Sequence, residues 1–289
     1  MRFAITGAAG MLGQDLDVAV SGSAHDVLAL PRAALDITDS GAVSEAIAAA
    51  RPDVVVNCAA WTDVDGAEAS PSRALAVNGA AAGNVARAAT AAGAWTIHVS
   101  SDYVFDGTKR SPYLESDPVG PLSEYGRSKL AGEQAVGAEA PGRHTIVRSS
   151  WLFGTGGGCF PATILRLAGE RDELKVVEDQ VGCPTFTGHL AAALVELGAR
   201  SVRPVGILHV AGGGECSWYE FAREIVAGAD VSCEVRPCST SDMPRPAPRP
   251  AYSVLRSERG DEAPGLPDWR EGLARYMALK AAAQEVRAA

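Results

Sequence analysis

Three glycines near the start of the chain constrain its fold more than any other feature. They lie between an apolar run at residues 3–6 and a segment of helical period at 11–21. One glycine allows a tight turn, one lets backbone approach a pyrophosphate, and one lets helix and strand pack closely. The free N–H groups of the helix would then face the phosphates. The residues predicted to bind a dinucleotide here are Gly7, Gly10, Met11, Leu12 and Gly13.

Short apolar runs alternate with longer Ala-rich segments of helical period along the first 150 residues. Strands are predicted at 3–6, 25–30, 53–57, 95–101 and 144–149, and helices at 11–21, 40–50, 72–92 and 124–136. This order predicts an α/β fold with a Rossmann-type doubly wound parallel sheet.

The pattern loosens after residue 151. Helices are predicted at 160–169, 187–199, 217–227 and from 268 to about 282, strands near 175–177 and at 206–211, and a Pro/Arg stretch at 236–250. We expect residues 1–153 and 187–212 to form an NAD(P)-binding Rossmann domain. Residues 154–186 and 213–289 would form a smaller C-terminal α/β lobe for the substrate.

Composition excludes several classes of function. The net charge of −9 argues against a nucleic-acid or anionic-membrane partner, because either would require a basic face. The longest uncharged run, 149–165, is too short and too rich in glycine for a membrane span, and no signal peptide is visible. The six cysteines lack zinc or C-x-x-C spacing and fit unpaired thiols in a reducing compartment. We therefore expect a cytoplasmic protein.

The second predicted strand ends near the place where such folds read the ribose of the cofactor. Arg32 stands there, and no acid occurs before Asp36. An acid would repel a 2′-phosphate whereas an arginine can pair with it, so we expect NADPH, with NADH as the second possibility. Asp36 and Ile37 would lie at the adenine end. The alternative for Arg32 is a solvated loop charge.

A tyrosine and a lysine four residues apart share one face of a predicted helix. An unperturbed tyrosine has a pKa of about 10, and an ammonium beside it lowers that pKa. Tyr125 would donate a proton to a carbonyl oxygen as a hydride arrives, and Lys129 would lower its pKa and hold the nicotinamide ribose. Ser101, at the end of a predicted strand, would bind the substrate oxygen. A Y-x-x-x-K alone is common, but the three residues behind a glycine turn predict a reductase site.

With these motifs the chain resembles the extended short-chain dehydrogenase/reductase family, and within it the dTDP-4-dehydrorhamnose reductases. The resemblance runs from residue 3 to about 280. It is carried by ITGAAGMLG at 5–13, LDITD at 35–39, NCAAWTDVDGAE at 57–68, SSDYVFDG at 100–107, YGRSKLAGE at 125–133, VRSSWLFG at 147–154, EDQVGCPT at 178–185 and RPAPRPAYSVL at 245–255.

The resemblance implies hydride transfer from a reduced nicotinamide to the C4 ketone of dTDP-4-dehydro-β-L-rhamnose, which gives dTDP-L-rhamnose. By position, Tyr125 is the proton donor, Lys129 its partner, and Ser101 the third member, where the family more often has Thr. The implied cofactor contacts also include Ala59, Ala60 and Trp61, although the family usually has Tyr or His at the last position. The implied substrate-binding residues are Val64, Ser101, Asp102, Tyr103, Tyr125, Trp151, Gln180 and Arg249.

Several of these roles have alternatives. Trp151 would offer an apolar wall to the methyl group of the deoxysugar, or it packs in the core. Arg249, ahead of Arg245, would pair with the diphosphate, or both are solvated charges of a polyproline loop. Thr185 is a further candidate for closing the sugar site. Some family members bind Mg²⁺ through acidic residues when they dimerise. We find no such set here, so no metal is predicted to be required, and a homodimer stays open.

Rival functions share much of this pattern. A nucleotide-sugar dehydratase commonly has Glu after the acid that follows the strand-end hydroxyl, but here Tyr103 follows Asp102. An epimerase, or another dTDP-deoxysugar 4-ketoreductase such as a dihydrostreptose synthase, would differ in details of the sugar site. A non-catalytic NADP-binding regulatory subunit need not keep the hydroxyl, tyrosine and lysine together. The deoxysugar, the product stereochemistry and the pathway, cell wall or secondary metabolite, stay open.

Overall fold

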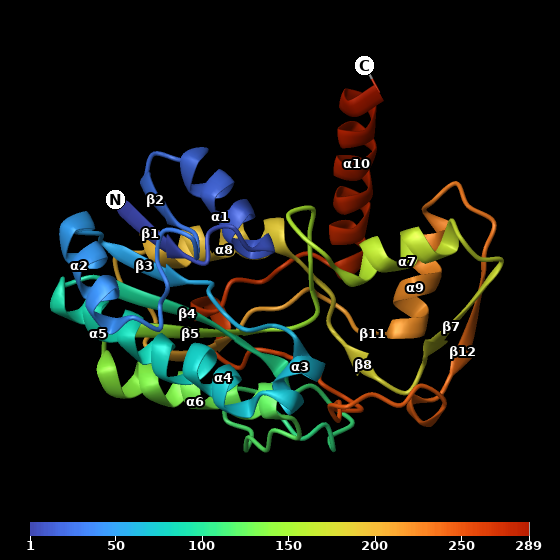
Figure 1. Ribbon diagram of the computed structural model, residues 1–289, viewed down its shortest axis with the longest axis horizontal. Coiled ribbons are helices and arrows are strands. Elements are labelled where there is room, and N and C mark those ends of the chain that lie inside the picture. Colours follow the sequence, from blue (N-terminus) through green and yellow to red (C-terminus); the bar gives the residue numbers. More distant parts are fainter. Residues whose placement is uncertain (289) are drawn as a thin grey trace.

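The computed structural model describes residues 1–288, and a six-stranded sheet forms its centre (Figure 1). The strands are ordered β10-β5-β4-β3-β1-β2, and every neighbouring pair is parallel. They are β1 (Arg2–Thr6), β2 (Asp26–Leu30), β3 (Val54–Asn57), β4 (Trp95–Ser101), β5 (His144–Ser149) and β10 (Gly206–His209). The chain adds β2 on one side of β1 and β3 on the other, so the order reverses beside β1, and the predicted doubly wound fold is confirmed.

Helices cover both faces of the sheet. On one side lie α1 (Met11–Ser21) and α8 (Thr187–Ala199), and on the other α2 (Ser40–Ala50), α5 (Ala81–Ala91) and α6 (Glu124–Glu139). Successive strand residues point to opposite faces, so Phe3 and Ile5 pack with the α1 side and Ala4 with the α2 side. The apolar run at residues 54–56 of β3 is buried on both faces, as expected for a parallel strand covered by helices.

The predicted helix at 72–92 changes its hydrogen-bonding pattern partway along. It consists of α4 (Pro71–Leu75), a π-helical turn at Ala76–Ala80, and α5. A short helix that the sequence analysis missed, α3 (Val64–Ala69), precedes it. Gly83 lies against α6, where an added Cβ would be 3.1 Å from the Cβ of Ala135. The abundance of small residues therefore serves close helix packing.

The remaining elements form a second group, here called the small lobe, at the right of Figure 1. It contains α7 (Phe160–Ala168), β7 (Glu173–Val177), β8 (Val181–Gly182), β11 (Cys216–Ser217), α9 (Trp218–Ala227), β12 (Glu234–Cys238) and α10 (Trp269–Ala288). It has its own buried cluster around Phe153, Phe221 and Trp269. Two short strands, β6 (Leu152–Phe153) and β9 (Thr185–Phe186), pair where the small lobe meets the sheet.

Two predictions for this part are wrong. The Pro/Arg stretch begins inside a strand, because β12 pairs with β7 along residues 234–238. In the described part of the chain this sheet has only these two strands, so Pro237 lies in an edge strand, where the N–H that proline lacks is not needed by another strand. The last helix reaches Ala288 rather than ending near 282. No helix within residues 1–288 combines the length and the apolar character that a membrane span needs.

Candidate active site

The glycine turn lies at the carboxyl edge of the sheet, between β1 and α1. Gly7 has a φ of +69°, and an added Cβ would come within 2.6 Å of the Ala59 backbone. A Cβ on Gly13 would lie 2.4 Å from the Gly7 carbonyl oxygen. Gly10 stands at the N-cap of α1, where no side chain caps the helix and no acid occupies the first turn. No side chain of the helix thus opposes an anion at this N-terminus, and the predicted phosphate contact stays a prediction.

The segment after β3 is fixed beside this turn by two asparagines. The Oδ1 of Asn57 accepts hydrogen bonds from Thr6 Oγ1 (2.7 Å) and from the N–H of Ala59 (3.2 Å). The side chain of Asn78, in the π-helical turn, accepts from the N–H of Trp61 (2.7 Å) and donates to its carbonyl (3.0 Å). Asn78 also donates to Ser128 Oγ of α6. The sequence analysis missed these contacts of Asn78. The only sign of them in the sequence is a polar residue within an Ala-rich helix.

The residues predicted at the ribose and the adenine differ in exposure. Arg32 and Asp36 are exposed, and hydrogen bonds from Thr38 lower the pKa of the Asp36 carboxyl, with a smaller effect of Arg32. Ile37 is buried in the cluster beneath α2, so its side chain is part of the core. Arg32 is thus available to an anionic group outside the sheet.

The predicted catalytic serine and tyrosine are brought together by β4 and α6. Ser101 is the last residue of β4, and its Oγ donates to Asp102 Oδ1 (3.0 Å). Tyr125 is the second residue of α6, and its ring lies edge-on to Tyr103 with centroids 5.5 Å apart. Burial raises the pKa of the Tyr125 phenol to about 12, the nearby Ser101 hydroxyl opposes this, and the Asp102 charge adds to it.

Lys129 lies one turn further along α6 and is buried. Its Nζ donates to the carbonyl oxygen of Val99 (2.7 Å). Burial lowers the pKa of this amine to about 8, against the opposing effects of Glu133 and Cys58. Burial dominates the Tyr125 pKa in this structure, and Lys129 is not among the groups that shift it, so the predicted lowering by Lys129 stays a prediction.

A buried ion pair joins α6 to the sheet. Arg148 of β5 donates through Nε (2.8 Å) and Nη2 (2.7 Å) to the two carboxylate oxygens of Glu133 in α6. Ser100 donates to the same carboxylate (2.6 Å). The pair, which the sequence analysis missed, ties the tyrosine–lysine helix to β4 and β5.

The side chain of Asp102 is enclosed by protein groups. Its oxygens accept hydrogen bonds from Ser101 Oγ and from Ser253 Oγ (2.6 Å), and only 1% of the residue is exposed. Burial raises the pKa of this carboxyl to about 6, although both serine hydroxyls act against the rise. Asp102 thus links Ser101 to the segment 245–255.

The predicted sugar-side residues come from separate segments. Val64 begins α3, and Trp151 directly precedes β6, both half-buried. Gln180 is buried and donates to Thr240 Oγ1 (2.9 Å). Thr185 is fully buried, with its hydroxyl between the Cys183 carbonyl and the Gly212 N–H, so it holds the chain together rather than facing a ligand.

Both predicted diphosphate partners face an aspartate. Arg249 donates to Asp65 Oδ1 (3.1 Å) and Oδ2 (3.0 Å), while Arg245 approaches the same carboxylate at 3.7 Å. The N–H of Ala247 also donates to Asp65, and the arginine hydrogen bond is the main cause of its lowered pKa. Arg249 therefore lies beside α3, next to Val64, already paired with a carboxylate.

Comparison with known proteins decides the family. The model described as the RmlD substrate binding domain matches residues 1–281. The chain belongs to this family. It is similar to the dTDP-4-dehydrorhamnose reductase of Mycolicibacterium smegmatis, with 48% identity over 278 residues, 94% of this chain and 84% of that protein. The reductase family predicted from the motifs is confirmed.

Solved structures of reductases superpose on this RmlD-family chain along nearly its whole length. That of a dTDP-4-dehydrorhamnose reductase from Clostridium acetobutylicum gives a TM-score of 0.93 at 40% identity and covers 97% of this chain and 100% of its own. That of the Bacillus anthracis enzyme in complex with NADP gives 0.91 at 38% identity, covering 96% and 98%.

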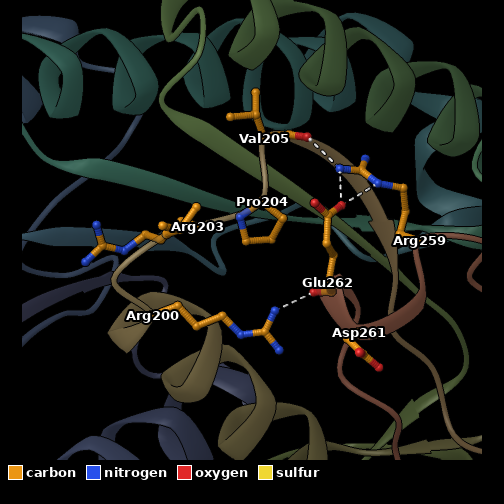
Figure 2. A pocket seen from close by; sticks show the side chains of 8 residues that line it. Arg200, Arg203, Pro204, Val205, Arg259, Asp261 and Glu262 are labelled. Atoms are coloured by element: carbon orange, nitrogen blue, oxygen red, sulfur yellow. Dashed lines mark hydrogen bonds and ion pairs between the residues drawn. The ribbon is translucent and has the colours of Figure 1, made fainter.

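A hollow of about 490 Å³ in this RmlD-family protein lies away from these residues (Figure 2). Pro204 and Val205 line it just before β10, hence at the edge of the sheet opposite Ser101. Arg200 donates to the carbonyl of Glu262 (2.7 Å), and Arg259 to its carboxylate. The guanidinium groups of these two arginines thus bind the loop that contains Glu262. No three acidic, histidine or cysteine side chains gather as metal ligands within residues 1–288.

Proposed function

We propose that the protein reduces the C4 ketone of dTDP-4-dehydro-β-L-rhamnose to dTDP-L-rhamnose with NADPH, in dTDP-rhamnose biosynthesis. The observation that carries the proposal is the meeting of Ser101, Tyr125 and Lys129 beside the glycine turn, in a chain 48% identical to a reductase of that name. Residues 1–153 and 187–212 would bind the cofactor, and 154–186 with 213–289 the sugar nucleotide.

The residues around the turn fit a dinucleotide. A side chain on Gly7 would fill the space beside Ala59, and the N-terminus of α1 has neither an acid nor a cap to oppose a phosphate. Arg32 would pair with the 2′-phosphate, and Lys129 would hold the nicotinamide ribose. When bound, the reduced nicotinamide supplies the hydride to the C4 carbon.

Tyr125 suits the role of proton donor. Because its pKa is about 12, the phenol is protonated at neutral pH and has a proton to give. Ser101 would hold the ketone oxygen, which takes this proton as C4 becomes a secondary alcohol. Lys129, with a pKa near 8, is largely charged at neutral pH and would stabilise the phenolate that remains.

The sugar side would be formed by Val64, Tyr103 and Trp151, with the last offering an apolar wall to the sugar methyl group. Arg249 would exchange Asp65 for the diphosphate, whose oxygens a guanidinium can bind in pairs.

One assay tests the proposal. Purified protein is mixed with dTDP-4-dehydrorhamnose, generated in situ, and with NADPH or NADH, and loss of the reduced nicotinamide absorbance is followed. We expect turnover, faster with NADPH, and a dTDP-L-rhamnose product by NMR. Absence of cofactor oxidation would contradict the reductase, and a different alcohol would favour another deoxysugar ketoreductase.

The same samples test three further parts of the proposal. Activity should survive EDTA, because no metal is required. A preference for NADH would contradict the role of Arg32. Sedimentation measures whether a homodimer forms. The six free cysteines fit a cytoplasmic enzyme.

A further inference from the structure

Trp151 adopts a backbone conformation that is unfavourable for its type. Its φ is +47°, in the left-handed region where a bulky residue is strained. Its indole lies flat against that of Trp218, with ring centroids 3.4 Å apart and planes within 4°. Since strain of this kind persists only where the surroundings impose it, the contacts of the indole determine where Trp151 points.

A short strand ladder brings those contacts together. A Cβ on Gly182, in β8, would come within 2.5 Å of the Trp151 ring, so only glycine allows this approach. Gly182 pairs with Cys216 of β11, and Ser217 of the same strand caps α9 through a capping box with Glu220. Trp218 is the first residue of that helix. The ladder therefore fixes Gly182 at one part of the indole and Trp218 at its face.

The stack joins two parts of the molecule. Trp151 lies in the two-residue link between β5 of the sheet and β6, while Trp218 belongs to the small lobe, where Phe160 supports it at a centroid distance of 4.5 Å. Both indoles stay half-buried. No step of the reduction proposed above uses Trp218.

We propose that Trp218 is a positioning residue, which holds the Trp151 indole as the apolar wall for the 6-deoxy sugar of the substrate. This inference rests on the proposed function. It separates the residue that faces the sugar from the residue that orients it, and it makes selection of the methyl group depend on contact between the small lobe and the sheet.

The test compares Trp218→Ala and Trp218→Phe with the unmodified enzyme. The alanine variant should abolish the circular-dichroism exciton couplet of the paired indoles and raise the KM for the ketosugar about tenfold, as expected for the loss of an aromatic pair. Its KM for NADPH should not change. The phenylalanine variant, which can still stack, should restore most of the ketosugar KM. Trp95→Phe, at the far end of β4, is the matched control and should change neither KM.

Gly182→Ala displaces Trp151 without altering Trp218, so it decides the question if Trp218→Ala does not fold. It should raise the same KM. An unmodified enzyme that does not oxidise NADPH with this ketosugar contradicts the proposed function. In an active enzyme, an unchanged KM in a folded Trp218→Ala that has lost the couplet overturns the role of Trp218 alone. An unchanged KM in Gly182→Ala removes Trp151 as the wall of the sugar site, and the role of Trp218 with it.

Discussion

The two halves of the candidate site are held by ion pairs of opposite character. Between α6, which carries Tyr125 and Lys129, and β5, the paired side chains of Glu133 and Arg148 are only 4% and 2% exposed. On the substrate side, Asp65 and Arg249 are 26% and 18% exposed and join α3 to the segment after residue 244. A buried pair cannot be opened without leaving a charge out of water, whereas water or an anion can replace a partner in the second.

This difference suits the two tasks. The groups proposed to hold and donate the proton would need to keep one geometry through the reaction, and the buried pair secures the helix that carries Tyr125 and Lys129. The arginine proposed to bind the diphosphate must change partner when the substrate arrives. An ion pair near an active site can thus belong to the scaffold or take part in binding, and the burial of its side chains distinguishes the two roles.

The largest expected effect is on the fixed half. Tyr125→Phe removes the proposed proton donor while keeping the ring that packs on Tyr103, so kcat should fall by about 10² to 10⁴ with little loss of stability. Steady-state kinetics and thermal melting measure both. Tyr219→Phe, in α9 of the small lobe, is the control. A rate near that of the unmodified enzyme would remove Tyr125 from the mechanism.

Breaking the buried pair should cost folding free energy. Arg148→Met leaves the Glu133 carboxylate without its main partner, and the free energy of unfolding in urea should fall by about 3–5 kcal/mol. Arg166→Met removes a pair with Glu170 whose side chains are both more than half exposed, and should cost about 1 kcal/mol at most. Equal losses in the two variants would contradict the assigned difference.

The buried carboxyl of Asp102 should make the stability of the fold depend on pH. Asp102 has a pKa of about 6 in the fold against 3.8 when unperturbed, so the folded state binds more protons between these values. The free energy of unfolding should therefore fall as pH rises from about 4 to 6, by about 3 kcal/mol from this group. Asp102→Asn should flatten that slope. Equal slopes in urea titrations of the two proteins would show that Asp102 is not its source.

The smallest effect is expected at the exposed pair. Asp65→Asn releases Arg249 from competition, so the KM for the sugar nucleotide should fall about threefold, whereas Arg249→Ala should raise it. Arg87→Ala is the control, because it breaks an exposed pair with Glu139 that lies outside the candidate site. If Asp65→Asn raised the KM as Arg249→Ala does, the pair would be a fixed support of the segment, like its buried counterpart.

Sequence reasoning succeeded where local pattern and geometry coincide. The glycine turn, the strand-end Ser101 and the Tyr125–Lys129 spacing each follow from one segment, so the sheet order and the convergence of these groups were predictable. The direction of the Tyr125 pKa was not, because it depends on burial by elements far along the chain.

The contacts that were missed join distant segments. Asn78 reaches back to Trp61, Ser253 reaches Asp102 across 151 positions, and Arg249 reaches Asp65 across 184. A single sequence shows such residues only as ordinary polar side chains, because their partners are set by the tertiary fold. The sugar side is built almost wholly from such contacts, which explains why it was less predictable than the cofactor side.

The π-helical turn at Ala76–Ala80 has a consequence for how this family can vary. A π turn accommodates one residue more than the α-helix around it, and each helical residue adds about 100° of rotation. Deleting that extra residue would leave an ordinary α-helical turn with α4 and α5 still in register, whereas a deletion inside α5 would turn the residues after it by this angle. A gap of one residue in the π turn is thus less disruptive than a gap elsewhere in this alanine-rich stretch, provided that Asn78 keeps its contact with Trp61.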